Sequence, residues 1–283
     1  MFKFFINFFA VFGSLYKKIA KNPFLILAVF CILIAPFHLI FQNFIQSEFI
    51  VNIFIAEICI IGLAVFYLHS KYKLNLTNIV ILLAITAILL HTMYILYTHI
   101  CVRGHDVIEG NLYALIKNFS KVNLKNSYIQ IEGHLGYILY LVNNFPTLPD
   151  FNPRGLWQFT HPPLHHFLSA IWIKINILSG IMVDRYGYRY FENVQILTLF
   201  YSGCIIIVTY KLLKELYLDR LALVIPFAII CFHPQMTLLS GSVNNDILCL
   251  ALSLITILFV IKWYKYTTIK NMACLLIFMC AAV

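Results

Sequence analysis

Three short segments of the sequence carry residues whose types could support proton transfer or phosphate binding. In the first, Asp106 follows Arg103-Gly104-His105 directly after an apolar run. A carboxylate beside histidine and arginine at a membrane boundary could accept a proton or bind a cation. The alternative is a solvated residue that forms a surface ion pair with Arg103 and contributes little. The spacing favours neither interpretation.

The second segment lies where the chain enters a later apolar run, which opens with the six residues HPPLHH at positions 161–166. Prolines are tolerated in the first turn of a helix, so His161 is predicted at the helix entrance and His165 one turn inside. The helix dipole favours an anion such as phosphate there. Two alternatives remain open: a zinc site from His161, His165 and a loop carboxylate, and interfacial histidines that only reach toward water.

The third segment is His233-Pro234, followed by the polar residues SGSVNND at positions 240–246. Asp246 is predicted to open a helix, where a carboxylate complements the helix dipole and acts as a cap. The functional alternative is that Asn245 and Asp246 face the same pocket as Asp106.

The composition identifies the class of protein that must position these residues. The chain is 62% hydrophobic and 11% charged, whereas soluble domains are about 25% charged. Such an excess of apolar surface must face lipid. Its 20 Lys and Arg residues lie between apolar runs and form no single stripe, which argues against a nucleic-acid partner.

Seven of the eight cysteines lie inside apolar runs and predict neither a disulfide framework nor a redox role.

The apolar runs predict an all-α, polytopic transmembrane helix bundle, because a helix needs about 20 apolar residues to cross a bilayer. A short stretch behind Lys3 predicts an interfacial anchor helix. The candidate spans are residues 24–41, 49–68, 79–100, 164–181, 194–213, 221–239 and 247–261. A further run from Met272 reaches the last residue after only 12 positions, so we expect a chain truncated at its C-terminus, inside a helix.

Lysines set the expected orientation, because cytoplasmic loops carry an excess of basic residues. Those around Lys17 and Lys71 place the N-terminus and the second loop inside. The long loop 103–161 is then extracytoplasmic, and helical spacing within it predicts amphipathic surface helices over residues 111–140.

Beyond this loop the basic residues conflict with one another. The loop 181–192 carries Arg185 and Arg189, and the loop 211–220 carries Lys211 and Lys214. One simple helix separates these loops, so both cannot be cytoplasmic. Either the helix over 164–181 does not cross fully, or the rule is broken once.

An ordered set of motifs completes the pattern. It consists of Gly104-His105-Asp106, Gly133-His134-Leu135-Gly136-Tyr137, Gln158-Phe159-Thr160-His161-Pro162-Pro163-Leu164 and Asn244-Asn245-Asp246. Over residues 79–261 this set resembles the family 39-type glycosyltransferases of the membrane-embedded C superfamily, which includes the protein O-mannosyltransferases and the lipid A aminoarabinose transferases. The HPPL entrance is its most specific element. The chain departs from many members at Val107, where they carry a Glu, and its first two spans look like an addition.

The resemblance implies a glycosyltransferase core over residues 77–283, incomplete at its C-terminus. Residues 1–76 would form an N-terminal region with the anchor helix and two additional spans. The resemblance further implies a multi-pass plasma-membrane enzyme of cell-envelope glycosylation, with an extracytoplasmic catalytic loop. A sugar would move with inversion from a polyprenyl-phosphate donor to an acceptor hydroxyl on a lipid, a protein or a polysaccharide. The implied partners are membrane lipid, donor and acceptor. No cofactor is implied, and a divalent cation is left open.

The resemblance also implies roles for single residues. Asp106 would be the general base, and Asp246 would orient the pocket or help to hold a cation. Substrate binding would involve Arg103, His105, His134, His161, His165, His166 and Asn245. A transporter or flippase, and an inactive membrane fragment, are the competing hypotheses.

Overall fold

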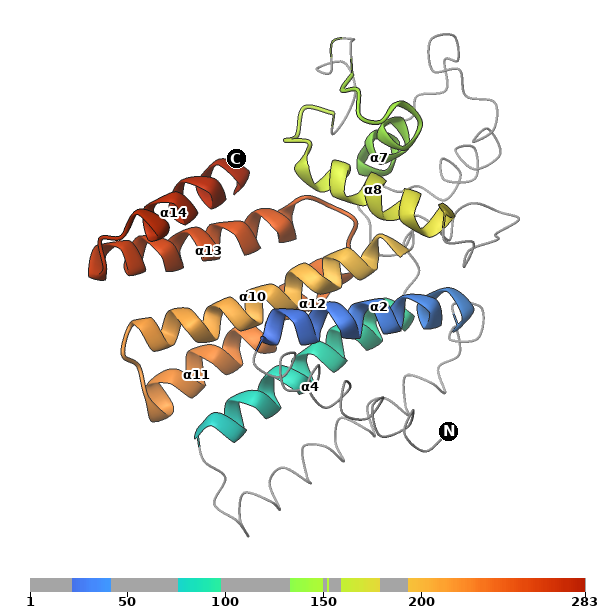
Figure 1. Ribbon diagram of the computed structural model, residues 1–283. Coiled ribbons are helices and arrows are strands. Elements are labelled where there is room, and N and C mark those ends of the chain that lie inside the picture. Colours follow the sequence, from blue (N-terminus) through green and yellow to red (C-terminus); the bar gives the residue numbers. More distant parts are fainter. Residues whose placement is uncertain are drawn as a thin grey trace, which may run out of the picture.

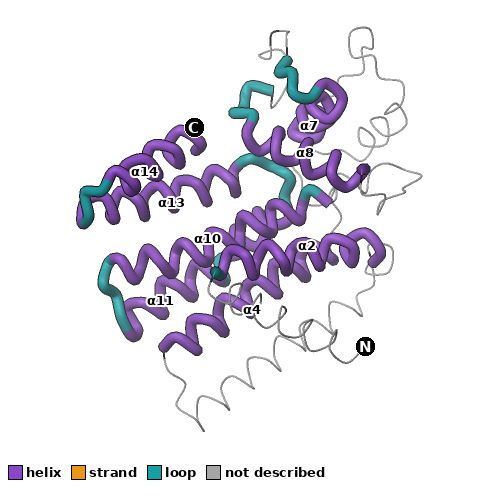
Figure 2. Tube along the Cα trace, in the orientation of Figure 1, coloured by secondary structure: helices purple, strands orange, loops and turns teal. Residues whose placement is uncertain are grey.

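The computed structural model describes residues 22–41, 76–97, 133–149, 152, 159–178 and 193–282 (Figure 1). All regular secondary structure within these ranges is helical (Figure 2). The helices are α2 (Pro23–Phe41), α4 (Leu76–Tyr97), α7 (Gly133–Asn144), α8 (Leu164–Leu178), α10 (Gln195–Glu215), α11 (Arg220–Cys231), α12 (Pro234–Gly241), α13 (Asp246–Lys265) and α14 (Ile269–Ala282). The predicted all-α fold is confirmed for these described ranges.

Three of these helices, α4, α10 and α13, are long and apolar enough to cross a membrane. They correspond to the predicted spans 79–100, 194–213 and 247–261, and they identify the chain as a membrane protein. The predicted span 49–68 and the N-terminal anchor helix lie outside the described residues.

The predicted span 221–239 is broken into α11 and α12, which are bent by 44°. The break falls at His233, because Pro234 has no N–H to continue the hydrogen bonding of α11. The His233 side chain accepts a hydrogen bond from the Gln235 N–H at 3.2 Å and so caps α12. The pair His233-Pro234 therefore has a clear structural role.

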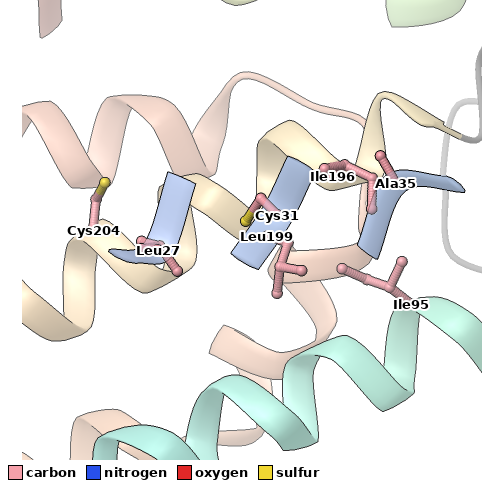
Figure 3. Packing of buried hydrophobic residues seen from close by; sticks show 7 residues of the cluster. All are labelled: Leu27, Cys31, Ala35, Ile95, Ile196, Leu199 and Cys204. Carbon is pink, nitrogen blue, oxygen red and sulfur yellow. The ribbon is translucent and has the colours of Figure 1, made fainter. Parts of the chain in front are cut away.

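Helix α10 lies at the centre of the bundle and packs against α2, α4, α11, α12 and α13. Within its most apolar stretch 67% is buried, against 28% for α4 and for α13. In the contact with α2, Leu27, Cys31 and Ala35 follow one face of α2 and pack onto α10 (Figure 3). Gly203 permits this approach, since a Cβ there would lie 2.5 Å from Leu27 Cδ2. Small residues allow such close helix packing in membranes.

The packing gives the bundle two chemically different ends. Near the start of α10, Ile196 packs with Ile95 at the end of α4, whereas near its other end Leu213 packs with Val80. Of the seven described lysines and arginines, six lie at this second end, hereafter the basic end: Lys211, Lys214, Arg220, Lys262, Lys265 and Lys270. The opposite end, where α10 and α13 begin, is called the histidine end.

Helix α8 does not connect the two ends. The Trp172 indole N–H donates to the Asn193 carbonyl at 3.0 Å, and the His165 ring lies 6.1 Å from that of Tyr201. Both contacts fall at the start of α10, so α8 lies beside the histidine end. This favours the first of the two interpretations of the basic loops, in which the helix over 164–181 does not cross. The 15 described residues of α8 are also fewer than the about 20 that a helix needs to cross a bilayer.

Helix α7 bears on part of the predicted surface helices. It falls at the end of the region 111–140, and the rest of that region lies outside the described residues. A helix is present, and Gly133 opens it with a φ of 83° that favours glycine. However, ten consecutive residues from Gly133 to Val142 are buried. Helix α7 is therefore enclosed by protein, not laid on a surface by one apolar face.

We predict that Gly203→Ala destabilises the protein by about 1–3 kcal/mol, because the new methyl group overpacks the α2–α10 contact. Thermal unfolding in detergent measures the effect. In a Leu27→Ala background the same substitution should cost far less, since the clashing side chain is gone. An equal cost in both backgrounds would contradict the proposed contact.

Candidate functional site

Three of the predicted histidines come together at the histidine end. His134 comes from α7, His166 from the first turn of α8, and His161 from the segment before α8. The His134 Nδ1 lies 3.0 Å from the His166 Nε2, which is hydrogen-bonding distance. The His134 ring centroid lies 5.5 Å from that of His161 and 5.3 Å from that of His166. We call these three residues and His165 the histidine cluster.

The HPPL segment leads into α8 as the sequence predicted, and it thereby positions the histidines on either side of the prolines. Helix α8 begins at Leu164, directly after the two prolines, and the Phe167 N–H donates to the Pro163 carbonyl at 2.8 Å. His165 and His166 therefore lie in the first turn. The Tyr137 ring covers His166 at 4.4 Å and stacks on Phe159 at 4.7 Å, so aromatic side chains enclose the imidazoles.

The turn between α12 and α13 reaches the same place. The Asn245 Nδ2 lies 3.5 Å from the His161 Nδ1, which brings a third predicted segment to the cluster. A buried hydrogen bond of 2.6 Å from the Thr198 hydroxyl to the Ser240 carbonyl fixes α12 against α10. Thr198 is thus a positioning residue for this turn.

Asp246, predicted to be catalytic, is the first residue of α13 and is exposed. This position agrees with the structural interpretation, in which the carboxylate complements the helix dipole. Its neighbour Asn245, not Asp246 itself, makes the contact with the cluster. Arg103, His105 and Asp106 lie outside the described residues, and their convergence with the histidines stays a prediction.

Burial favours the neutral form of His134, His165 and His166. Burial, and secondarily the nearby His161, lowers the pKa of His134 from 6.5 to about 4. His165 and His166 are 1% and 0% exposed, and an unpaired buried charge would be very costly. A neutral imidazole has one N–H donor and one acceptor nitrogen. These three imidazoles can therefore stabilise a phosphate oxygen by hydrogen bonds, without bringing positive charge.

The zinc alternative involves His161, His165 and a loop carboxylate. Among the described residues, no three His, Cys, Asp or Glu side chains are grouped to hold a metal ion. The loop carboxylates that could complete a zinc site with His161 and His165 lie outside those residues.

Sequence reasoning missed several residues at this end. Tyr137 and Asn244 lie in two of the motifs, but the resemblance implied no role for either. Tyr201 and Ser169 lie inside apolar runs, where nothing in the sequence distinguishes them from core residues. Only their placement next to His165 draws attention to them.

Comparison of the chain with protein-family models, curated proteins and solved structures found no match. Over its described residues, the protein is an all-helical membrane protein. A histidine cluster lies at one end of its helix bundle.

We predict that acid loosens the contact between α7 and α8. Because the folded-state pKa of His134 is lowered, its contribution to stability is complete above about pH 6.5 and is lost as the pH falls toward 4. Thermal unfolding across this range should show a falling midpoint, and His134→Gln should flatten the fall. The control Lys214→Gln, at an exposed side chain of the basic end, should keep the wild-type dependence. Identical profiles for all three proteins would contradict the assignment.

Proposed function

We propose that this protein is a membrane glycosyltransferase that moves a sugar from a polyprenyl-phosphate donor to an acceptor hydroxyl with inversion. The observation that carries the proposal is the meeting of three motif segments, at His134, His161 and Asn245, which are far apart in sequence. These are segments on which the resemblance to family 39-type glycosyltransferases rests. Purely structural residues would have no reason to converge in one buried, polar place.

The chemistry is a single displacement. The acceptor oxygen forms a bond to the anomeric carbon, its proton passes to the Asp106 carboxylate, and the bond from that carbon to the phosphate oxygen breaks. Polyprenyl phosphate leaves with the electron pair. The neutral N–H groups of the histidine cluster are suited to hydrogen-bond the phosphate, where negative charge grows in the transition state.

The distribution of charge supports an orientation in the plasma membrane. Six described basic residues lie at the basic end, which therefore faces the cytoplasm by the excess of positive charge found on that side. The histidine end, with the continuation into the loop 103–161, faces outward. A donor whose isoprenoid chain lies in the bilayer would reach the cluster from the lipid, and the acceptor would arrive from outside.

We predict that Asp106→Asn lowers sugar transfer by on the order of 10²-fold or more, because the amide keeps the shape but cannot accept the proton. The measurement is transfer of label from a panel of polyprenyl-phosphate sugars in membranes that contain the protein. Asp219→Asn is the matched control, since this exposed carboxylate pairs with Arg220 at the basic end. Full activity of the Asp106 variant would remove the proposed base.

A second candidate is a transporter or flippase, which one observation favours. The helix pair α11–α12 is discontinuous, and His91 and Ser202 form a buried polar contact of 3.2 Å between α4 and α10. Broken helices and polar groups within the membrane are characteristic of transporters.

A measurement that needs no acceptor distinguishes the glycosyltransferase from the transporter. Liposomes that contain the purified protein are loaded with a fluorescent polyprenyl-phosphate sugar, and its movement between leaflets is followed. We expect movement equal to that in protein-free liposomes. Faster movement that is abolished by His91→Leu would favour the transporter.

A further inference from the structure

Four polar side chains beside the histidine cluster have buried atoms without a hydrogen-bond partner among the residues that the structure describes. The atoms are both ring nitrogens of His165, the Tyr201 hydroxyl, and the side-chain oxygens of Asn244 and Asn245. His165 is 1% exposed and Tyr201 is 6% exposed. Leaving a buried polar atom unpaired lowers the free energy of unfolding. Four such residues in one neighbourhood therefore need an explanation other than stability.

These residues come from three segments that meet. The Tyr201 ring lies 6.1 Å from the His165 ring, edge to face. Tyr201 also packs with Ile247 and Leu248 at the start of α13, directly after the two asparagines. Tyr201 thus lies between the first turn of α8 and the turn that precedes α13.

The chemistry of this group is neutral throughout. A phenol and an imidazole each donate and accept, and the two asparagine oxygens accept. The described residues of this group include no lysine or arginine. Lys174 lies nine residues beyond His165 on α8, with its ammonium 5.2 Å from the centre of the Phe145 ring. No described countercharge lies here, so an anion would be held by hydrogen bonds alone, whereas hydroxyl groups can both donate to and accept from the unpaired atoms.

We infer that Tyr201, His165, Asn244 and Asn245 form a binding site for an uncharged ring that bears several hydroxyl groups, such as one monosaccharide unit. The inference rests on the proposed function for one point, the identification of this ring with the sugar of the donor or of the acceptor. Tyr201, which lies in an apolar run, then binds substrate from inside the helix bundle.

The substitution Tyr201→Phe separates a binding role from a structural one, because it removes only the hydroxyl. In the free protein this hydroxyl has no described partner, so its removal should leave thermal stability unchanged or raise it. In the complex it would remove one hydrogen bond, which weakens binding by about three- to tenfold. A structural hydroxyl would instead lower thermal stability and leave binding unchanged.

The experiment uses the purified full chain in nanodiscs and three probes. These are a polyprenyl phosphate carrying one hexose, the same polyprenyl phosphate without the sugar, and the soluble methyl glycoside of that hexose. The hexose is chosen as the best-bound member of a small panel that also includes pentoses. The dissociation constant of each probe is measured for wild type, Tyr201→Phe and Tyr210→Phe. Tyr210 lies on the same helix but packs against Phe227, toward the basic end, and serves as the matched control.

We expect wild type to bind the sugar-bearing lipid more tightly than the bare lipid phosphate, and Tyr201→Phe to reduce this preference by about three- to tenfold. The control variant should keep it. A loss confined to the lipid-linked hexose assigns the ring to the donor, and a loss confined to the methyl glycoside assigns it to the acceptor.

The inference is overturned if Tyr201→Phe binds all probes as wild type does, or if wild type shows no preference for a sugar-bearing probe. Its failure is distinguishable from that of the proposed function. Sugar binding that depends on Tyr201, without any transfer, would leave the site standing and remove the enzyme. Transfer that depends on Asp106, with binding unchanged in Tyr201→Phe, would support the enzyme and remove the binding site at Tyr201.

Discussion

The packing of α10 against five neighbouring helices is the constraint on which the rest of the structure depends. This helix buries most of its apolar stretch, and it carries groups that matter at both ends of the bundle. Near its start, Thr198 holds α12 through a hydrogen bond of 2.6 Å to the Ser240 carbonyl. At its other end, Glu215 lies 3.5 Å from Lys265 and 3.8 Å from Lys262 on α13. Without this central helix, neither the turn before α13 nor the basic end would have a fixed place.

The same packing separates two kinds of polar group. Charged side chains are collected at the basic end, where lysines lie over aromatic rings: Lys211 is 4.4 Å from the centre of the Phe24 ring and Lys265 is 3.8 Å from that of Tyr217. The buried imidazoles of the histidine end are polar but uncharged, because burial disfavours their protonated form. One end is thus suited to the charged face of a membrane, and the other to hydrogen bonding with a substrate.

Neutrality changes the chemistry that was expected of the histidines. Stabilisation of a leaving phosphate can come from positive charge or from oriented N–H groups. The burial of His165 and His166 selects the second. The unpaired atoms of Tyr201 and its neighbours are likewise neutral donors and acceptors. A site of this kind prefers a ligand with hydroxyl groups over one without them, because a ligand without them would leave the buried atoms of the site unpaired.

The sequence by itself determined the class of the protein, most of the described helices and the start of α8. Composition requires a membrane protein because so much apolar surface has no other place, and the two prolines before Leu164 start a helix because of their fixed backbone geometry. The resemblance implied a role in substrate binding for His134, His161 and Asn245, but only the structure shows that the three lie together.

Only the tertiary structure decided whether a helix crosses the bundle, which side chains are charged and which polar residues lack partners. Hydropathy scores each segment alone, so it could not show that α8 lies beside the histidine end, where Trp172 and His165 contact the region at the start of α10. Burial of α7 and of Tyr201 likewise depends on residues that are distant in sequence. These properties belong to contacts between segments, which local patterns of residues do not contain.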